Sequence, residues 1–138
     1  MVAKVLIAIE LSESAHTVLK AGKGLADTYH AHCEVIHCLE PYPKHFGDTV
    51  MPDLIEIKNE LFPRFASITS QHGFKQDAID IAFGHTSKTI VEKANTEKFD
   101  LIVLGSHASH GLDLLLGSNC NDVLHHAKCD VLAVRIDE

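Results

Sequence analysis

Five short apolar segments alternate with four amphipathic segments along this chain of 138 residues. Continuous runs of apolar and β-branched residues predict strands that are covered on both faces. Apolar residues that recur every three or four positions predict the helices between them. The predicted strands span residues 4–9, 32–39, 77–83, 100–105 and 131–136, and the predicted helices span 13–29, 52–71, 86–97 and 118–127. Pro63 lies inside the second helix and is expected to kink or split it.

The alternation of strands and helices predicts an α/β fold with an open five-stranded parallel sheet and helices on both faces. Right-handed crossovers leave few arrangements, and the preferred strand order is 3-2-1-4-5. The winding direction reverses between strands 1 and 4, and ligands of such sheets bind at that reversal, beyond the carboxyl ends of the strands. Glu10, at the end of the first strand, and Gly105, at the end of the fourth, are therefore expected to face one crevice.

The length fits a single domain, residues 1–138, with room for an apolar core. The formal net charge is −7 and no run of Lys or Arg occurs, so neither a nucleic acid nor a membrane is an expected partner. The first residues lack a signal-peptide pattern. The four cysteines (Cys33, Cys38, Cys120 and Cys129) have no C-x-x-C spacing, so we expect reduced thiols and a cytoplasmic location.

The turn after the first strand lacks the features of a phosphate-binding loop. Residues 10–14 contain no glycine and two carboxylates, which argues against a dinucleotide fingerprint, and the chain has no Walker motif. The candidate is the loop after the fourth strand, where Gly105 and Gly111 permit unusual or close-packed backbone. Gly117 and Ser118 open a helix whose N–H groups attract anions. The alternative is that these glycines only end a strand and cap a helix.

Segments along nearly the whole chain form a specific combination. They are VLIAIELS at residues 5–12, VIH at 35–37, DLIVLGSH at 100–107, and Gly117 and Ser118 followed by VLAVR at 131–135. Together they resemble the universal stress proteins of the UspA family. The resemblance implies an adenine nucleotide alpha hydrolase-like fold, a cytoplasmic role in stress response and a dimer.

Members of that family that bind ATP resemble G-x2-G-x9-G-[ST] and carry an Asp after the first strand. This chain has Ala108 at the second glycine, eight residues between Ala108 and Gly117, and Glu10 in place of the Asp. A methyl group near the phosphates, a shorter loop and a longer acidic side chain each disfavour binding. Gly105, Gly117 and Ser118 are retained. Binding of ATP or AMP and its loss therefore both stay open.

The resemblance also implies which residues would hold a nucleotide. They are Ala8, Ile9, Glu10 and Cys38 on the adenosine side, and Gly105, Ser106, Ala108, Gly117, Ser118 and Asn119 at the phosphates. Residues 105–119 contain no Lys or Arg, so phosphate charge would rest on backbone N–H groups and, for a triphosphate, on Mg²⁺. Efficient phosphoryl transfer needs more charge compensation than this, so slow ATP hydrolysis is the most that is expected.

The eleven histidines lack the spacing of metal ligands, so no metal site is expected. His107 and His110 lie in the loop, where a protonated imidazole could meet a phosphate.

The strand at residues 131–136 is apolar and forms one edge of the predicted sheet. Such an edge must be paired or covered, and Asp137 and Glu138 are too few to cover it. We therefore expect a homodimer that pairs this strand with its copy about a two-fold axis. Three hypotheses of function result. The first is a dimeric stress-response regulator that binds an adenine nucleotide, and the second is a dimeric adaptor without a nucleotide, whose protein partner is unknown. The third, an enzyme that acts on a nucleotide or another phosphorylated ligand, is the weakest, because the sequence shows no general base with a partner.

Overall fold

All five predicted strands form one parallel sheet. The computed structural model describes residues 2–40, 53–107 and 117–137. The strands are β1 (Lys4–Ala8), β2 (His32–Leu39), β3 (Ile79–Phe83), β4 (Leu101–His107) and β5 (Asp130–Ile136). Each neighbouring pair is parallel, and the order is β3-β2-β1-β4-β5, which confirms the predicted topology.

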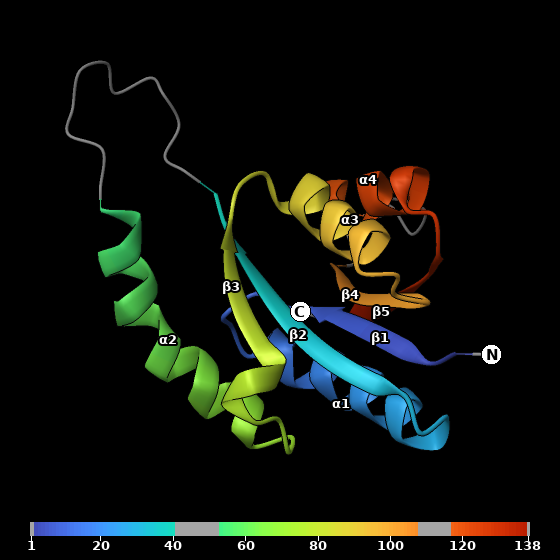
Figure 1. The fold of residues 1–138 in the computed structure, drawn as a ribbon, viewed down its shortest axis with the longest axis horizontal. Helices are drawn as coiled ribbons and strands as arrows, with labels where there is room; N and C mark the ends of the chain where they lie inside the picture. The colour runs from blue at the N-terminus through green and yellow to red at the C-terminus, as the bar shows by residue number, and fades with distance from the viewer. Residues whose placement is uncertain (1, 41–52, 108–116, 138) are drawn as a thin grey trace.

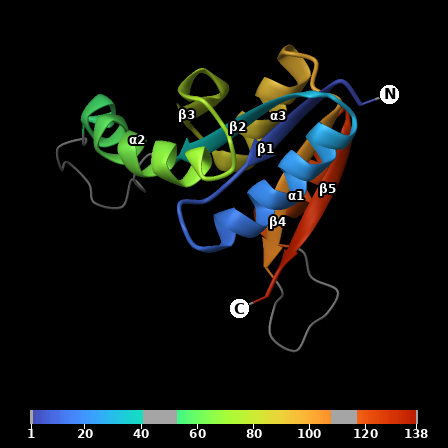
Figure 2. The same cartoon turned by 90° about the horizontal axis from the view of Figure 1, so that it is seen from below.

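The helices lie on both faces of the sheet (Figures 1 and 2). In the part of the chain that the structure describes, α1 (Ser14–Thr28) and α2 (Leu54–Ser70) cover one face, and α3 (Thr86–Thr96) and α4 (Ser118–His126) cover the other. Right-handed crossovers between parallel strands account for this distribution, because the winding direction changes after the third strand.

The core is divided into two apolar clusters, one on each face of the sheet. Successive strand residues point to opposite faces, so Val5 and Ile7 belong to the cluster under α1 and α2, and Leu6 belongs to the cluster under α3 and α4. All three are 0% exposed, as the continuous apolar run predicts for a central strand. Cys33 and Cys38 pack against different clusters, which confirms that they point to opposite faces.

Three details of the elements differ from the prediction. The helix α2 is one continuous helix with Pro63 inside it, so of the two expected effects, a kink or a split, the split does not occur. The strand β4 continues two residues beyond Gly105, because Gly105, Ser106 and His107 all pair with β5. The strand β3 begins at Ile79, since residues Gln76–Ala78 form a 3₁₀ turn (η2).

Asp100 fixes the amino ends of the two central strands. Its carboxylate oxygen Oδ2 accepts hydrogen bonds of 2.9 Å from the backbone N–H groups of Ala3 and Lys4. These bonds hold the pKa of Asp100 below its usual value, because they favour the charged carboxylate. These bonds connect the residue before β4 to the start of β1. Across the described residues, no helix is both long enough and apolar enough to cross a bilayer.

Candidate functional site

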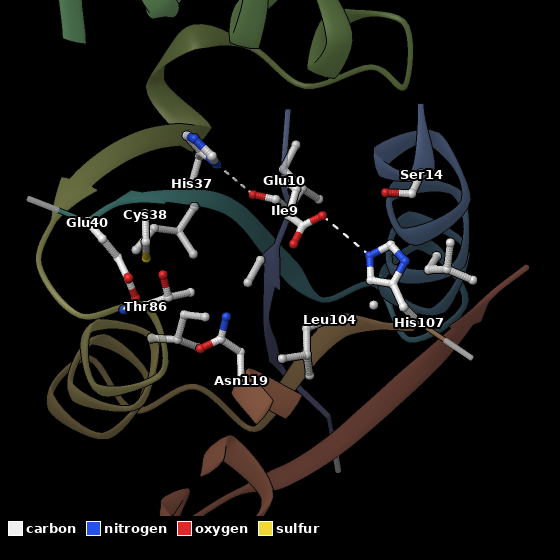
Figure 3. A pocket seen from close by; sticks show the side chains of 15 residues that line it. Ile9, Glu10, Ser14, His37, Cys38, Glu40, Thr86, Leu104, His107 and Asn119 are labelled. Carbon is white, nitrogen blue, oxygen red and sulfur yellow. Dashed lines mark hydrogen bonds and ion pairs between the residues drawn. The ribbon is translucent and has the colours of Figure 1, made fainter. Parts of the chain in front are cut away.

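A cavity of about 320 Å³ lies beyond the carboxyl ends of β1, β2 and β4, at the reversal of the strand order. This is the position that the topology predicts. Figure 3 shows that its lining converges from both halves of the sheet and from the first residues of α1, α3 and α4. Ile36, Ile90, Leu104 and Ile136 supply apolar surface. Among the polar residues, Glu40 and Thr86 lie on one side of the cavity and His107 lies on the other.

The structure brings six of the ten predicted site residues together in this cavity. They are Ala8, Ile9, Glu10, Cys38, Gly105 and Asn119. Ser106, Gly117 and Ser118 do not line it. Ala108 lies outside the described residues. Glu10 and Gly105 face one cavity, as expected from the strand order.

Ser106 lies inside β4, which is longer than predicted, and its side chain does not line the cavity. Its hydroxyl is hydrogen-bonded to the thiol of Cys120, a buried residue of α4. Burial is the larger influence and raises the pKa of that thiol. Ser106 therefore connects β4 to α4 rather than facing the cavity.

The two retained glycines differ in what the fold requires of them. A Cβ atom at Gly105 would lie 3.2 Å from side-chain atoms of both Ile136 and Val18, so the packing at this position is tight. A Cβ atom at Gly117 would meet nothing within 4 Å. Its φ of −57° is open to any residue. Nothing in the described part of the fold requires glycine at position 117.

Glu40 and Thr86 form a contact that the sequence did not indicate. Glu40 follows β2, and its Oε1 accepts a hydrogen bond of 2.9 Å from the backbone N–H of Thr86, the first residue of α3. This hydrogen bond lowers the pKa of Glu40 from its usual value, so the carboxylate is charged at neutral pH. His85, the N-cap residue, makes no side-chain capping bond, so Glu40 supplies one from a distant segment. The only signal in the sequence was that Glu40 follows a strand.

Glu10 is paired with His107 at the other end of the cavity. Oε2 of Glu10 lies 3.4 Å from Nε2 of His107 at the end of β4 (Figure 3). His107 was noted as a loop histidine that could meet a phosphate, and the structure places it in the lining. His37, which was not predicted, donates a hydrogen bond of 2.8 Å from Nδ1 to the carbonyl oxygen of Ile9. That bond positions the segment from β1 to Glu10.

The chemistry of the lining suits binding of a flat, partly apolar ligand. Burial raises the pKa of Cys38 to about 11, and the carboxylates of Glu40 and Asp80 add to this effect, so the thiol is neutral. Lys and Arg are absent from the lining that the structure describes. No group of three His, Cys, Asp or Glu side chains within residues 2–40, 53–107 and 117–137 is arranged to hold a metal ion.

A doubly wound parallel α/β domain with a cavity at its topological reversal is the class that this fold and site define. The universal stress protein family model matches residues 1–135. The chain is 37% identical to universal stress protein A homolog 2 of Coxiella burnetii over 138 residues, which cover 96% of this chain and 94% of that protein. The chain therefore belongs to the universal stress protein family.

Solved structures have the same fold. A universal stress protein from Archaeoglobus fulgidus in complex with dAMP is 24% identical, with a TM-score of 0.63 and coverage of 97% of this chain and 99% of that chain. A universal stress protein in complex with cAMP is 22% identical, with a TM-score of 0.60 and coverage of 96% of both chains.

Proposed function

We propose that this universal stress protein binds an adenine nucleotide in the cavity at the strand reversal and acts as a dimeric, cytoplasmic stress-response regulator. The observation that carries the proposal is the cavity itself, in which separate segments predicted to contact the adenosine meet at the expected end of the sheet. Two proteins of the same fold have dAMP and cAMP as their ligands, which supports an adenine compound.

The adenosine part would lie along Ala8, Ile9 and Cys38, where the cavity is apolar and the thiol is neutral. The phosphate would extend toward Gly117 and the first turn of α4, whose N–H groups favour an anion. Gly117 supports this arrangement, because the described fold gives no steric reason for a glycine there. Close approach of a phosphate to the backbone would explain why residue 117 is a glycine.

If the ligand is a triphosphate, one carboxylate near the end of β4, that of Glu10, would be available to hold Mg²⁺. Glu10 is the acidic residue at the end of the cavity near β4, and its oxygens are of the type that Mg²⁺ prefers. Mg²⁺ commonly uses one or two carboxylates together with the phosphates of its ligand, and in that arrangement it would neutralise phosphate charge. The chain's own part would be to orient the ligand through Glu10 and to enclose its base.

The test begins with the protein as purified. Mass analysis of released ligands is expected to find an adenine nucleotide, and calorimetric titration with AMP or ATP is expected to give heat. Gly117→Val should abolish binding, because the new side chain blocks the backbone. Gly24→Val is the matched control, since a Cβ atom at that position also meets nothing within 4 Å.

An adaptor without a nucleotide is the second candidate function. It is favoured by one observation, that Gly117 and Ser118 do not line the described cavity. No adenine nucleotide in the purified protein and no heat with millimolar AMP or ATP would support the adaptor and reject the first proposal. Equal binding by wild type and Gly117→Val would reject only the position given to the phosphate.

A further inference from the structure

The charged groups in the lining of the cavity are unusual for a nucleotide site. Glu10 and Glu40 contribute two carboxylates, one at each end. His37 and His107 are the basic side chains among the described lining residues. A phosphate group that enters this cavity therefore meets negative charge without a permanent cation in the described lining to offset it.

Glu40 occupies a position that would otherwise suit an anion. Thr86, the first residue of α3, lines the cavity, and backbone N–H groups at the amino end of a helix attract negatively charged ligands. The carboxylate of Glu40 already accepts the N–H of Thr86 at 2.9 Å. A phosphate at this end would have to displace or approach a charged carboxylate, so this end favours the uncharged part of a ligand.

Glu10 controls the opposite end. Its carboxylate lines the same cavity on the side of His107, so a phosphate group inside the cavity lies within the field of this charge (Figure 3). Its partner His107 lies 3.4 Å away and offsets the charge only when the imidazole is protonated.

Two arginines of the described chain use their guanidinium groups in other contacts, and one of them, Arg135, lines a neighbouring hollow with Glu10 and His107. The guanidinium of Arg64 donates to the carbonyl oxygen of Leu11 at 2.7 Å, and that of Arg135 donates to Asp137 at 3.1 Å. Neither residue lines the cavity.

We propose that Glu10 and Glu40 make the cavity selective for adenine ligands of low negative charge, so that adenosine and AMP bind more tightly than ATP without Mg²⁺. This selection rests on the proposed function, because it assumes that an adenine compound occupies the cavity. Each added phosphate charge increases the repulsion from the two carboxylates, while the contacts of the adenosine part stay the same. Mg²⁺ reduces the difference by neutralising part of the triphosphate.

The test is calorimetric titration of the full chain with adenosine, AMP and ATP at about pH 8, where histidine is neutral, in the presence of a chelator. Adenosine and AMP are expected to bind roughly tenfold more tightly than ATP, as a moderate charge repulsion implies. Glu10→Gln and Glu40→Gln should each raise the affinity for ATP relative to the affinity for adenosine by roughly three- to tenfold. Glu60→Gln, on the exposed side of α2, is the matched control and should change neither.

The outcomes separate the two proposals. Tighter binding of Mg²⁺-free ATP than of adenosine would overturn the charge selection and leave nucleotide binding intact. Equal changes for all three ligands in the Gln variants would also overturn it, because a purely structural role affects adenosine as strongly as ATP. Circular dichroism identifies a variant that has lost its fold, and Gln at position 40 retains an oxygen that can accept the N–H of Thr86. No binding of any of the three ligands by the wild type would overturn the proposed function and the selection together.

Discussion

Gly22 of α1 lies directly against Ile7 of β1: a Cβ atom at position 22 would come within 2.5 Å of Cδ1 of Ile7. Ile7 is 0% exposed, so it has little space in which to move. We predict that Gly22→Ala destabilises the protein, because overpacking of about 1–3 kcal/mol outweighs the gain in helix propensity. Thermal and urea unfolding measure the change.

Gly24 provides the control in the same helix. A Cβ atom there meets nothing within 4 Å, so Gly24→Ala should stabilise the protein by about 0.5–1 kcal/mol through helix propensity alone. If both variants were stabilised to the same extent, α1 would not approach β1 as closely as the structure indicates.

The position of Gly22 shows what the sequence predicts and what it leaves out. The periodicity of apolar residues predicts that residue 22 lies on the buried face of α1, and the alternation of strands and helices predicts the sheet order. The distance between Gly22 and Ile7 depends on how α1 packs on the sheet. Periodicity carries no information about that distance.

The candidate site, like the position of Gly22, was predicted by the sequence only in part. Its place follows from the topology, since Glu10 and Gly105 end strands on either side of the reversal. The hydrogen bond between Glu40 and Thr86 joins residues that are 46 positions apart, and no local sequence pattern predicts it. The resemblance assigned Ser106 to the phosphates. In the structure Ser106 belongs to β4, which continues two residues beyond Gly105, and its hydroxyl is bonded to Cys120.

Cys38 offers a chemical probe of the cavity. It lines the cavity, is partly exposed and has a pKa raised to about 11, so it should react slowly with a maleimide at about pH 8. We predict that saturating adenosine or AMP slows this reaction several-fold, because the bound base covers the thiol. Mass spectrometry of the labelled peptides gives the rate. Cys129 is also partly exposed, lies outside the cavity and should react at an unchanged rate.

The strand β5 forms one edge of the described sheet, and pairing of two copies there is the basis of the proposed homodimer. We predict a mass of two chains by sedimentation equilibrium. Ala133→Glu should shift the mass toward one chain, because antiparallel pairing about this position brings two like charges together.

Ala82→Glu is the matched control, since Ala82 lies in β3, the strand at the other edge of the described sheet. Ala82 and Ala133 are both partly buried and both pack against the cluster under α3 and α4, so the two substitutions should cost similar stability. Loss of the dimer in both variants, or in neither, would argue against pairing through β5.

His16 and His72 join α1 to the segment after α2. Nδ1 of His16 lies 2.9 Å from Nε2 of His72, and the ring centroids are 5.2 Å apart. One proton between the two nitrogens makes an N–H···N hydrogen bond, whereas a proton on each nitrogen breaks it. Burial, followed by the neighbouring His16, lowers the pKa of His72 from its usual value of 6.5.

A lowered pKa in the folded state means that the unfolded chain binds the proton more tightly. The neutral His72 therefore contributes stability that is fully present above about pH 6.5 and is lost as the pH falls through the lower, folded pKa. We predict that the wild type loses more stability between about pH 8 and pH 5 than His72→Gln, as measured by urea unfolding across that range. His125→Gln, an exposed change on α4, should keep the wild-type dependence. An identical pH dependence in all three proteins would mean that the histidine pair does not couple protonation to the packing of α1 and α2.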